Sequence, residues 1–298
     1  MTHDLQAAIA NTSYRITAST SVAAVIGDPV KHSLSPIIHN VGFQSLGIDW
    51  VYVAYEVKAG QARAALDAVR IFGLRGLSVT MPHKSDVADL VDTVSTAAQA
   101  LKSVNTVEVG ANGLLVGHST DGDGLVASLS AQGVDVTGKS ILILGAGGAA
   151  RSIVDALKRH RSHNIVIANR SLAGAQSAQA LAPKISQSLA LSDSAALKTA
   201  VSSADIVINA TSIGMSKDSV HLSDSPLSAD LITPQHTVVD LVYHPIQTEL
   251  LRNAQQRGAQ TVDGLGMLVH QAALQQQIWT GFVPDVPDMY RAALQALS

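Results

Sequence analysis

The chain has 298 residues, of which 47% are hydrophobic and 14% are charged. This length favours two domains, and this composition excludes a disordered chain, a collagen and a coiled coil. Cysteine is absent, which excludes disulfides, thiolate zinc sites, iron–sulfur clusters and a cysteine nucleophile. The net charge is −3 and both signs are interspersed. Such a surface has no strong field to attract nucleic acid or a membrane, so the expected partner is a small molecule.

Alternating strand and helix patterns run through the whole chain. Apolar runs bounded by turn residues predict strands at residues 22–27, 50–57, 76–81, 105–109, 141–145, 165–169, 205–210 and 237–242. Helical patterns are found at residues 60–70, 85–91, 122–131, 148–160, 172–182 and 266–280. Such alternation indicates an α/β protein with mostly parallel strands. Aromatic residues supply only 3% of the chain, so we expect a core of Ala, Val, Leu and Ile.

Neither an export signal nor a membrane span is predicted. Residues 1–15 contain no basic segment leading into an apolar run, so we expect no signal peptide and a cytoplasmic protein. The longest uncharged stretch, residues 264–284, is long enough to span a bilayer. It contains one histidine and four glutamines, however, and therefore predicts a buried helix instead.

A glycine-rich turn after residues 141–144 predicts a dinucleotide site. The residues Gly145, Ala146, Gly147, Gly148, Ala149 and Ala150 fit the pattern GxGxxA between a strand and a helix. The first glycine permits a tight turn, the second lets the backbone approach a pyrophosphate, and the last small residue allows close helix–strand packing. The helix N-terminus supplies unpaired N–H groups for the phosphates. The strand predicted at 165–169 completes the βαβ unit.

The residues at the end of the strand predicted at 165–169 indicate whether NAD or NADP binds. NAD-binding folds commonly place a carboxylate there to hold the ribose 2′-hydroxyl, but this chain has Asn169, Arg170 and Ser171. A carboxylate would repel a 2′-phosphate, whereas a guanidinium can bind it with two hydrogen bonds. The sequence therefore favours NADP. The alternative is that Arg170 merely begins a solvated helix.

A basic cluster at residues 158–163 falls at a predicted helix C-terminus. Cations complement the helix dipole there, so we do not expect a nucleic-acid surface. The eleven histidines are otherwise scattered, and the pair His160 and His163 lacks nearby carboxylate or cysteine ligands. We therefore predict no metal site.

Three polar clusters fall where predicted strands of the first half end, the usual place for a site in an open α/β sheet. They are residues 32–36, residues 78–84 together with 104–106, and residues 119–124. Each has a plainer explanation when taken alone. Ser33 and Ser35 could form a turn and a helix cap before Pro36. Lys84 could be a surface lysine, and Asp121 could cap the following helix.

Together with the GxGxxA turn, these clusters resemble the shikimate dehydrogenase family over nearly the whole chain. The resemblance is carried, in order, by residues 27–29, 33–36, 39–40, 79–84, 104–106, 120–122, 145–150, 169–171, 209–211, 214–215, 240–243, 245, 263–269 and 271–272. So many short motifs in one order are highly specific. The resemblance implies reversible, NADPH-dependent reduction of 3-dehydroshikimate to shikimate, a step of aromatic amino acid biosynthesis.

The resemblance also implies roles for individual residues. Lys84 matches the family's catalytic lysine and Asp121 its partner carboxylate. This pair suits a reaction in which hydride delivery builds negative charge on a carbonyl oxygen. The implied substrate-binding residues are Ser33, Ser35 and Tyr243 for a carboxylate, and Thr80, Asn105 and Gln271 for ring hydroxyls. The implied cofactor-binding residues are Gly145, Ala146, Gly147, Gly148, Ala149, Asn169, Arg170, Ser171, Thr211, Gly264 and Met267.

The family's architecture implies two domains. We expect an N-terminal α/β substrate domain with a mainly parallel sheet from residues 1–121 plus 265–298, and a Rossmann-type NADP-binding domain from residues 122–264. The best turn-rich boundary is residues 132–140, although the helix before it could bridge both domains. The cleft between the domains should close on ligand. We expect a monomer or a homodimer.

Four positions depart from the family's usual pattern. Ser119 stands where Asn is common, Lys102 where small residues are usual, Gly174 where a second basic residue often occurs, and Gln276 where Phe is frequent. Lys102 would disturb Lys84 by charge repulsion if it pointed inward, but we expect its long side chain to reach outward. With Gly174, Arg170 has no second basic residue beside it to bind the 2′-phosphate, so the use of NAD remains an alternative.

Two other functions also stay open. A family relative that oxidises quinate as well as shikimate, with NAD or NADP, needs room for one more hydroxyl near Ser33, Ser35 and Tyr243. A non-catalytic nucleotide-sensing module would keep the same fold. It has no need for a proton-transfer pair, so Lys84 and Asp121 argue against it.

Overall fold

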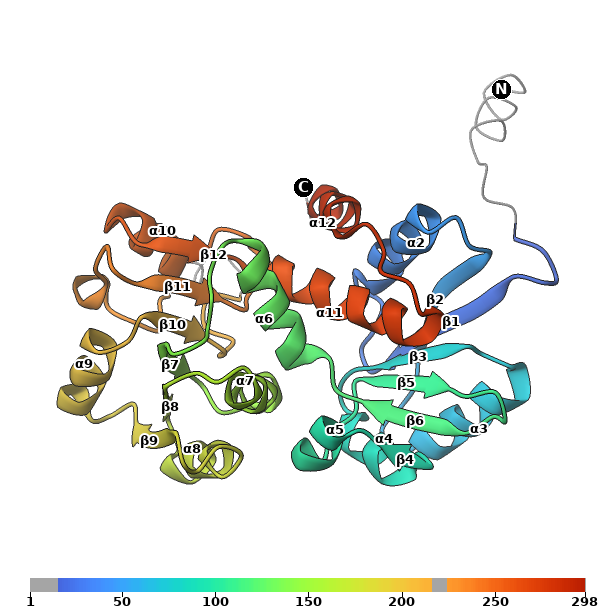
Figure 1. The fold of residues 1–298 in the computed structure, drawn as a ribbon, viewed down its shortest axis with the longest axis horizontal. Helices are drawn as coiled ribbons and strands as arrows, with labels where there is room; N and C mark the ends of the chain where they lie inside the picture. Colours follow the sequence, from blue (N-terminus) through green and yellow to red (C-terminus); the bar gives the residue numbers. More distant parts are fainter. Residues whose placement is uncertain (1–15, 216–223, 298) are drawn as a thin grey trace, which may run out of the picture.

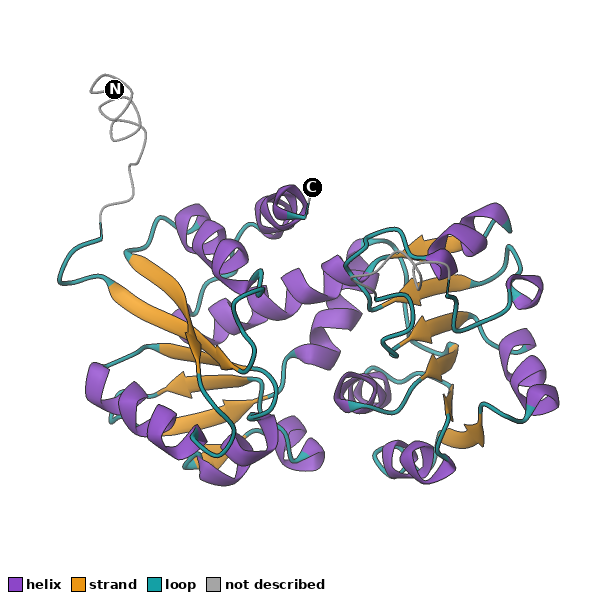
Figure 2. Cartoon of the chain, turned by 180° about the vertical axis from the view of Figure 1, so that it is seen from behind, coloured by secondary structure: helices purple, strands orange, loops and turns teal. Residues whose placement is uncertain are grey.

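The computed structural model describes residues 16–215 and 224–297 (Figure 1). Two six-stranded sheets with helices packed on them form this part of the chain, so the predicted α/β class is confirmed (Figure 2). Residues 1–15, on which the signal-peptide prediction rests, lie outside the described residues. No helix in the described ranges is long and apolar enough to cross a membrane.

The first sheet has the strand order β2-β1-β3-β5-β6-β4. Its strands are β1 (Ser21–Gly27), β2 (Trp50–Glu56), β3 (Gly76–Val79), β4 (Thr93–Val94), β5 (Thr106–Val109) and β6 (Leu115–His118). β1 is parallel to β2 and β3, and β4 is parallel to β6, whereas β5 is antiparallel to both of its neighbours. The sequence did not predict β4 and β6, because runs this short show no clear alternation.

The second sheet is parallel throughout, with the order β12-β11-β10-β7-β8-β9. Its strands are β7 (Ser140–Leu144), β8 (Asn164–Asn169), β9 (Ser186–Ala190), β10 (Ile206–Asn209), β11 (Thr237–Asp240) and β12 (Gln260–Val262). The chain winds outward in both directions from the neighbours β7 and β10, which is the doubly wound Rossmann order. Ligands bind outside the carboxyl ends of such strands at this switch point, and the glycine-rich turn follows β7 there.

Helices cover both sheets (Figure 2). In the first half they are α2 (Ser35–Ser45), α3 (Ala62–Phe72), α4 (Lys84–Leu90), α5 (Thr96–Leu101) and α6 (Asp121–Ala131). In the second half they are α7 (Gly148–Arg159), α8 (Leu172–Gln179), α9 (Ser194–Ser202), the short 3₁₀ helix η1 (Ala229–Leu231), α10 (Glu249–Gln256), α11 (Gly264–Thr280) and α12 (Val286–Ala296). Every predicted helix forms, and the sequence missed α2, α5, α9, α10 and α12.

Strand β7 shows why the second sheet requires continuous apolar runs. Ile141 and Ile143 are buried with residues of α6, α7 and α8. Leu142 and Leu144 are buried in a separate core with residues of α9 and α10. Successive side chains of a strand point to opposite faces. Because helices cover both faces, every position from Ile141 to Leu144 must be apolar.

Helices α6 and α11 pack together between the two sheets (Figure 1). Two glycines allow the close approach at the start of α6. A Cβ at Gly122 would lie 2.1 Å from the carbonyl oxygen of Ser152 in α7, and a Cβ at Gly124 would lie 2.7 Å from the Cβ of Gln271 in α11. A larger residue at either position would push α6 away from its neighbours. The first turn of α6, which begins with Asp121, is therefore held tightly.

The two C-terminal helices return to the first half of the chain. Ile38 of α2 is fully buried in a cluster with Leu265 and Val269 of α11 and Met289 of α12. The C-terminal segment thus shares a hydrophobic core with the N-terminal part.

The basic cluster at residues 158–163 pairs with two carboxylates, Asp155 one turn earlier in α7 and Asp123 in α6. Arg159 donates to both oxygens of Asp123 at 2.8 and 3.0 Å, and its Nε donates to Asp155 at 2.9 Å. His160 lies 3.3 Å from the same Asp123 carboxylate. These ion pairs join the end of α7 to α6. Among the residues that the structure describes, no three His, Asp or Glu side chains gather as metal ligands would.

Candidate active site

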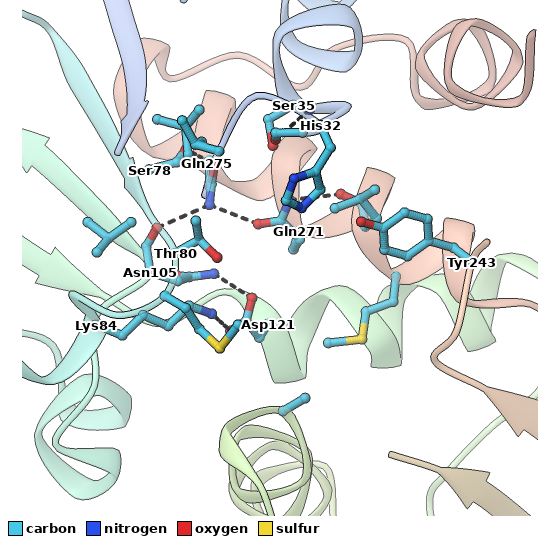
Figure 3. Close-up of a pocket in the computed structure, with 18 of the residues that line it drawn as sticks. His32, Ser35, Ser78, Thr80, Lys84, Asn105, Asp121, Tyr243, Gln271 and Gln275 are labelled. Atoms are coloured by element: carbon cyan, nitrogen blue, oxygen red, sulfur yellow. Dashed lines mark hydrogen bonds and ion pairs between the residues drawn. The ribbon is translucent and has the colours of Figure 1, made fainter. Parts of the chain in front are cut away.

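A cavity of about 370 Å³ lies where the first sheet faces the first turn of α7 and the start of α11 (Figure 3). Every predicted catalytic and substrate-binding residue lines it: Ser33, Ser35, Thr80, Lys84, Asn105, Asp121, Tyr243 and Gln271. Three predicted cofactor-binding residues also line it: Ala149, Gly264 and Met267. The fold thus brings together residues that are spread over most of the sequence.

The central feature of this cavity is an ion pair between Lys84 and Asp121. Lys84 begins α4 and Asp121 begins α6, and the Lys84 Nζ lies 2.7 Å from Asp121 Oδ2. The Lys84 side chain is 31% exposed and the Asp121 side chain 16%. Lys84 is therefore not simply a surface lysine, and Asp121 is not simply a helix cap. The Asp121 carboxylate binds Lys84 and Asn105 (Figure 3).

Asn105 fixes the position of the carboxylate. Its Nδ2 donates to Asp121 Oδ1 at 2.7 Å and to Thr120 Oγ1 at 2.9 Å. Its Oδ1 accepts from the backbone N–H of Thr120 at 2.9 Å and from Thr106 Oγ1 at 2.8 Å. Asn105 is almost fully buried, so its amide has one orientation. Each Asp121 oxygen therefore has one fixed donor, and the carboxylate holds Lys84 Nζ in the cavity.

Several hydroxyl side chains line the cavity, among them those of Ser33, Ser35, Thr80 and Tyr243. Ser33 Oγ accepts from the N–H of Ser35 at 3.2 Å, which shapes the turn into α2. Leu34, and not Ser35, stands at the N-cap of α2, and no side chain caps this helix. Burial raises the pKa of the Tyr243 phenol, so it stays a neutral hydrogen-bond donor. Tyr243 and Thr80 have no side-chain hydrogen bond to any described residue and are free to meet a ligand.

The glycine-rich turn has the shape that a dinucleotide requires. Gly145 has a φ of +105°, and a Cβ there would lie 2.9 Å from the carbonyl oxygen of Ala210. Gly147 stands at the N-cap of α7, and a Cβ there would point into open space. Gly147 and Gly148 are exposed, so the unpaired N–H groups of the first turn of α7 are accessible to phosphates. The residues present therefore fit a bound pyrophosphate.

The residues after β8 fit the predicted NADP selectivity. Arg170 is exposed and makes no hydrogen bond or ion pair to a residue of the described ranges. Asn169 Nδ2 donates to the Ser171 carbonyl at 3.0 Å, and Ser171 Oγ caps α8 by accepting from the Gly174 N–H at 3.3 Å. A Cβ at Gly174 would lie 2.7 Å from Asn169 Nδ2. A side chain at this position would therefore require the Asn169 amide to shift.

Buried Asp240, at the end of β11, connects the two loops beside the cofactor turn. Its carboxylate accepts from Asn209 Nδ2 at 2.8 Å, Thr248 Oγ1 at 2.7 Å and the N–H of Val242 at 3.0 Å. Burial raises the pKa of this carboxyl, and these donors counter part of the effect. Asn209 Oδ1 in turn accepts from the hydroxyl of Thr211 at 2.7 Å. The network fixes Thr211 beside the turn at Gly145.

Two of the remaining departures from the family pattern, Lys102 and Gln276, have structural explanations. Lys102 is exposed and has a φ of +50° at the end of α5, as expected for a side chain that reaches outward. Gln276 is fully buried, and its Nε2 donates to the carbonyl oxygen of His39 at 2.9 Å. Burial lowers the pKa of His39 to about 3, so that its ring stays neutral. Ser119 has no hydrogen bond within the described part of the chain, and nothing in the structure assigns it a role.

Gln275 and Tyr52 were not predicted from the sequence, whereas Ser78 belongs to the predicted polar cluster at residues 78–84. Ser78 and Gln275 line the cavity, and the Tyr52 phenol lies behind Ser78. Gln275 lies four residues after Gln271, which puts both amides on one face of α11. That spacing was a usable signal. Nothing in the sequence pattern of β2 distinguishes Tyr52 from an ordinary core residue.

Comparison with known proteins agrees with this geometry. Residues 25–107 match the model of the shikimate dehydrogenase substrate binding domain, residues 126–234 that of shikimate / quinate 5-dehydrogenase, and residues 264–294 that of the shikimate 5′-dehydrogenase C-terminal domain. A protein of Moorella thermoacetica named shikimate dehydrogenase (NADP+) is 38% identical over 289 residues, which cover 95% of this chain and 96% of that protein.

Solved structures of similar proteins have the same fold. Shikimate 5-dehydrogenase of Listeria monocytogenes, in complex with shikimate and NAD, has a TM-score of 0.89 at 35% identity, covering 94% of this chain and 98% of that one. Quinate dehydrogenase of Corynebacterium glutamicum, in complex with NAD, has a TM-score of 0.84 at 29% identity, covering 93% and 99%. The resemblance predicted from the motifs is confirmed: the chain belongs to the shikimate dehydrogenase family.

Proposed function

We propose that this protein is an oxidoreductase that interconverts 3-dehydroshikimate and shikimate with NADP as its cofactor. The observation that carries the proposal is the Lys84–Asp121 pair, 2.7 Å apart, in a cavity that also reaches the first turn of α7. The name of the Moorella relative states the same activity and cofactor. A module that only binds a nucleotide has no use for a proton-transfer pair at this position.

The roles of the pair follow from charge. Bound NADPH supplies a hydride to the substrate ketone, and bound NADP+ takes it back in the reverse direction. Lys84 Nζ stabilises the negative charge that develops on the ketone oxygen and donates the proton that completes the alcohol. Asp121 holds the ammonium against that oxygen and helps to remove the hydroxyl proton in the reverse direction.

The other lining residues recognise the substrate ring. Ser33, Ser35 and Tyr243 present hydroxyl donors that suit the substrate carboxylate. Thr80, Asn105 and Gln271 lie toward Lys84 and suit the ring hydroxyls. Such a site rejects analogues that lack a hydroxyl, because its polar groups would then stay unpaired.

The bound cofactor would be held by Gly264 and Met267 at the cavity, by Gly145–Ala149 and Thr211 at the glycine-rich turn, and by Asn169–Ser171, where Arg170 would bind the 2′-phosphate. We further propose residues 1–121 plus 265–298 as the substrate domain and residues 122–264 as the nucleotide domain. The shared core of α2, α11 and α12 supports this division. A cytoplasmic location and a monomeric or homodimeric state stay predictions, and light scattering after size exclusion measures the second.

A two-by-two assay tests the function. Oxidation of shikimate and of quinate is followed with NADP and with NAD, through the absorbance of the reduced nicotinamide. We expect the highest kcat/KM with shikimate and NADP. The similarity to an NAD-bound quinate dehydrogenase makes quinate with NAD the second candidate. If kcat/KM for quinate with NAD equals that for shikimate with NADP, the protein is a quinate/shikimate dehydrogenase instead. If no combination shows turnover, the protein is a nucleotide-binding module without activity.

Arg170→Ala tests whether Arg170 recognises the 2′-phosphate of NADP. We expect KM for NADP to rise about tenfold or more, because a charge-assisted hydrogen bond to a phosphate is lost. KM for NAD should hardly change. Arg161→Ala is the matched control. Arg161 is also exposed, but it lies just after the C-terminal end of α7, whereas the glycine-rich turn precedes the N-terminal end. Equal losses with both cofactors would mean that Arg170 does not contact the 2′-phosphate.

A further inference from the structure

A buried chain of hydrogen bonds leads from the interior of the first sheet to Gln271. Tyr52 OH lies 2.6 Å from Ser78 Oγ, and Ser78 Oγ lies 2.5 Å from Gln275 Oε1. Gln275 Nε2 donates to Gln271 Oε1 at 2.8 Å and lies 3.4 Å from the carbonyl oxygen of Asn105 (Figure 3). Gln275 is 2% exposed, so water does not compete for these bonds.

The chain has one direction. Burial raises the pKa of Tyr52 above its ordinary value, so the phenol stays protonated and can donate to Ser78. The NH₂ end of Gln275 lies beside the carbonyl oxygen of Asn105, which only accepts. The Gln275 oxygen therefore faces Ser78 and receives its single hydrogen. With its oxygen on Ser78, Gln275 must present its NH₂ group to Gln271.

The Gln271 amide is thereby oriented from two sides. Its Oε1 accepts from Gln275, and its Nε2 donates to the carbonyl oxygen of Leu268 at 2.8 Å. A flip of this amide would set two NH₂ groups against each other and two oxygens against each other. An NH₂ group carries two hydrogens, so one N–H of Gln271 is left for a ligand in the cavity.

We propose that Gln275 is a positioning residue that fixes the orientation of the Gln271 amide, so that Gln271 presents an N–H donor to an oxygen of the substrate ring. This inference rests on the proposed function, in which Gln271 contacts the substrate. Gln275 acts through Gln271 and does not need to touch the substrate itself. Ser78 and Tyr52 determine which end of the Gln275 amide faces Gln271.

The test compares two adjacent glutamines. In Gln275→Leu, we expect KM for shikimate to rise about five- to tenfold, as for one lost hydrogen bond, with a smaller change in kcat and none in KM for NADP. Gln276→Leu is the matched control. Gln276 is equally buried on the same helix, but its amide binds His39, which does not line the cavity. The control should keep the wild-type KM for shikimate.

A double-mutant cycle distinguishes positioning from a general structural effect. In a Gln271→Leu background, Gln275→Leu should cause no further rise in KM. Additive effects of the two substitutions would overturn the inference and leave the proposed function intact. If Gln271→Leu alone leaves KM unchanged, then the substrate role of Gln271 fails together with the inference.

Gln275→Glu provides a second variant that keeps the bond from Ser78. Its other carboxylate oxygen would face Gln271 Oε1 and drive the Gln271 amide to flip. We expect KM for shikimate to rise at least as much as in Gln275→Leu. A wild-type KM in this variant would overturn the inference. Circular dichroism and the thermal midpoint establish which variants fold, and Gln275→Met replaces Gln275→Leu if the latter does not.

Discussion

Replacing Lys84 with alanine should lower kcat by about 10²-fold or more. The substitution removes both the positive charge that stabilises the developing alkoxide and the proton that completes the alcohol. The effect on KM for shikimate should be smaller, because the hydroxyl and amide side chains around the cavity remain. Steady-state kinetics in both directions measure the two effects separately.

Lys102→Ala is the matched control for Lys84→Ala. Lys102 lies at the end of α5, is exposed and does not line the cavity. Its replacement should leave kcat and both KM values near those of the wild type. Near-normal turnover of Lys84→Ala would remove this lysine from the mechanism.

Asp121→Asn should also lower kcat by about 10²-fold. The amide is nearly isosteric, but it carries no charge to hold the Lys84 ammonium against the reacting oxygen. It also brings a second NH₂ group beside Asn105 Nδ2 or Lys84 Nζ, which lie 2.7 Å from the two carboxylate oxygens. KM for NADP should be unchanged, because the nucleotide turn lies on another element.

Asp123→Asn provides the comparison on the same helix. Asp123 is two residues along α6, and its carboxylate binds Arg159 outside the cavity. This variant should keep the wild-type kcat, even if the thermal midpoint falls because α6 and α7 lose an ion pair. A normal rate in Asp121→Asn would assign the carboxylate a structural task only, which is to hold Asn105 and Lys84 in place.

The first βαβ unit of the nucleotide half was predictable because its signals are local, whereas β9, α9, α10 and β12 of the same half were missed. Ile141–Leu144, the turn at Gly145 and the helix that follows are consecutive in sequence. Backbone sterics and strand alternation act over a few residues, so each of these features leaves its own pattern. The same holds for Thr80, just after β3, and for Lys84 and Asp121, which begin α4 and α6.

Elements without a strong local pattern were missed. Helix α2 mixes Asn40, Gly42 and Gln44 with its apolar residues, and much of its packing comes from α12 and α11, more than 200 residues later in the chain. Strands β4 and β6 are short, and their pairing partners stabilise them. The predicted strand at 76–81 ends at Val79, because Thr80 and the following residues leave the sheet to enter the cavity.

By itself, the sequence determined the α/β class, the family and the identity of the residues that now line the cavity. Only the tertiary structure decided how these residues meet. Lys84 and Asp121 are 37 positions apart, and Ser78 and Gln275 are 197 positions apart. A hydrogen bond depends on distances within about 3 Å, and such distances follow from how glycines such as Gly122 let helices approach. A one-dimensional pattern records which groups are present, whereas their partners and directions are set by packing.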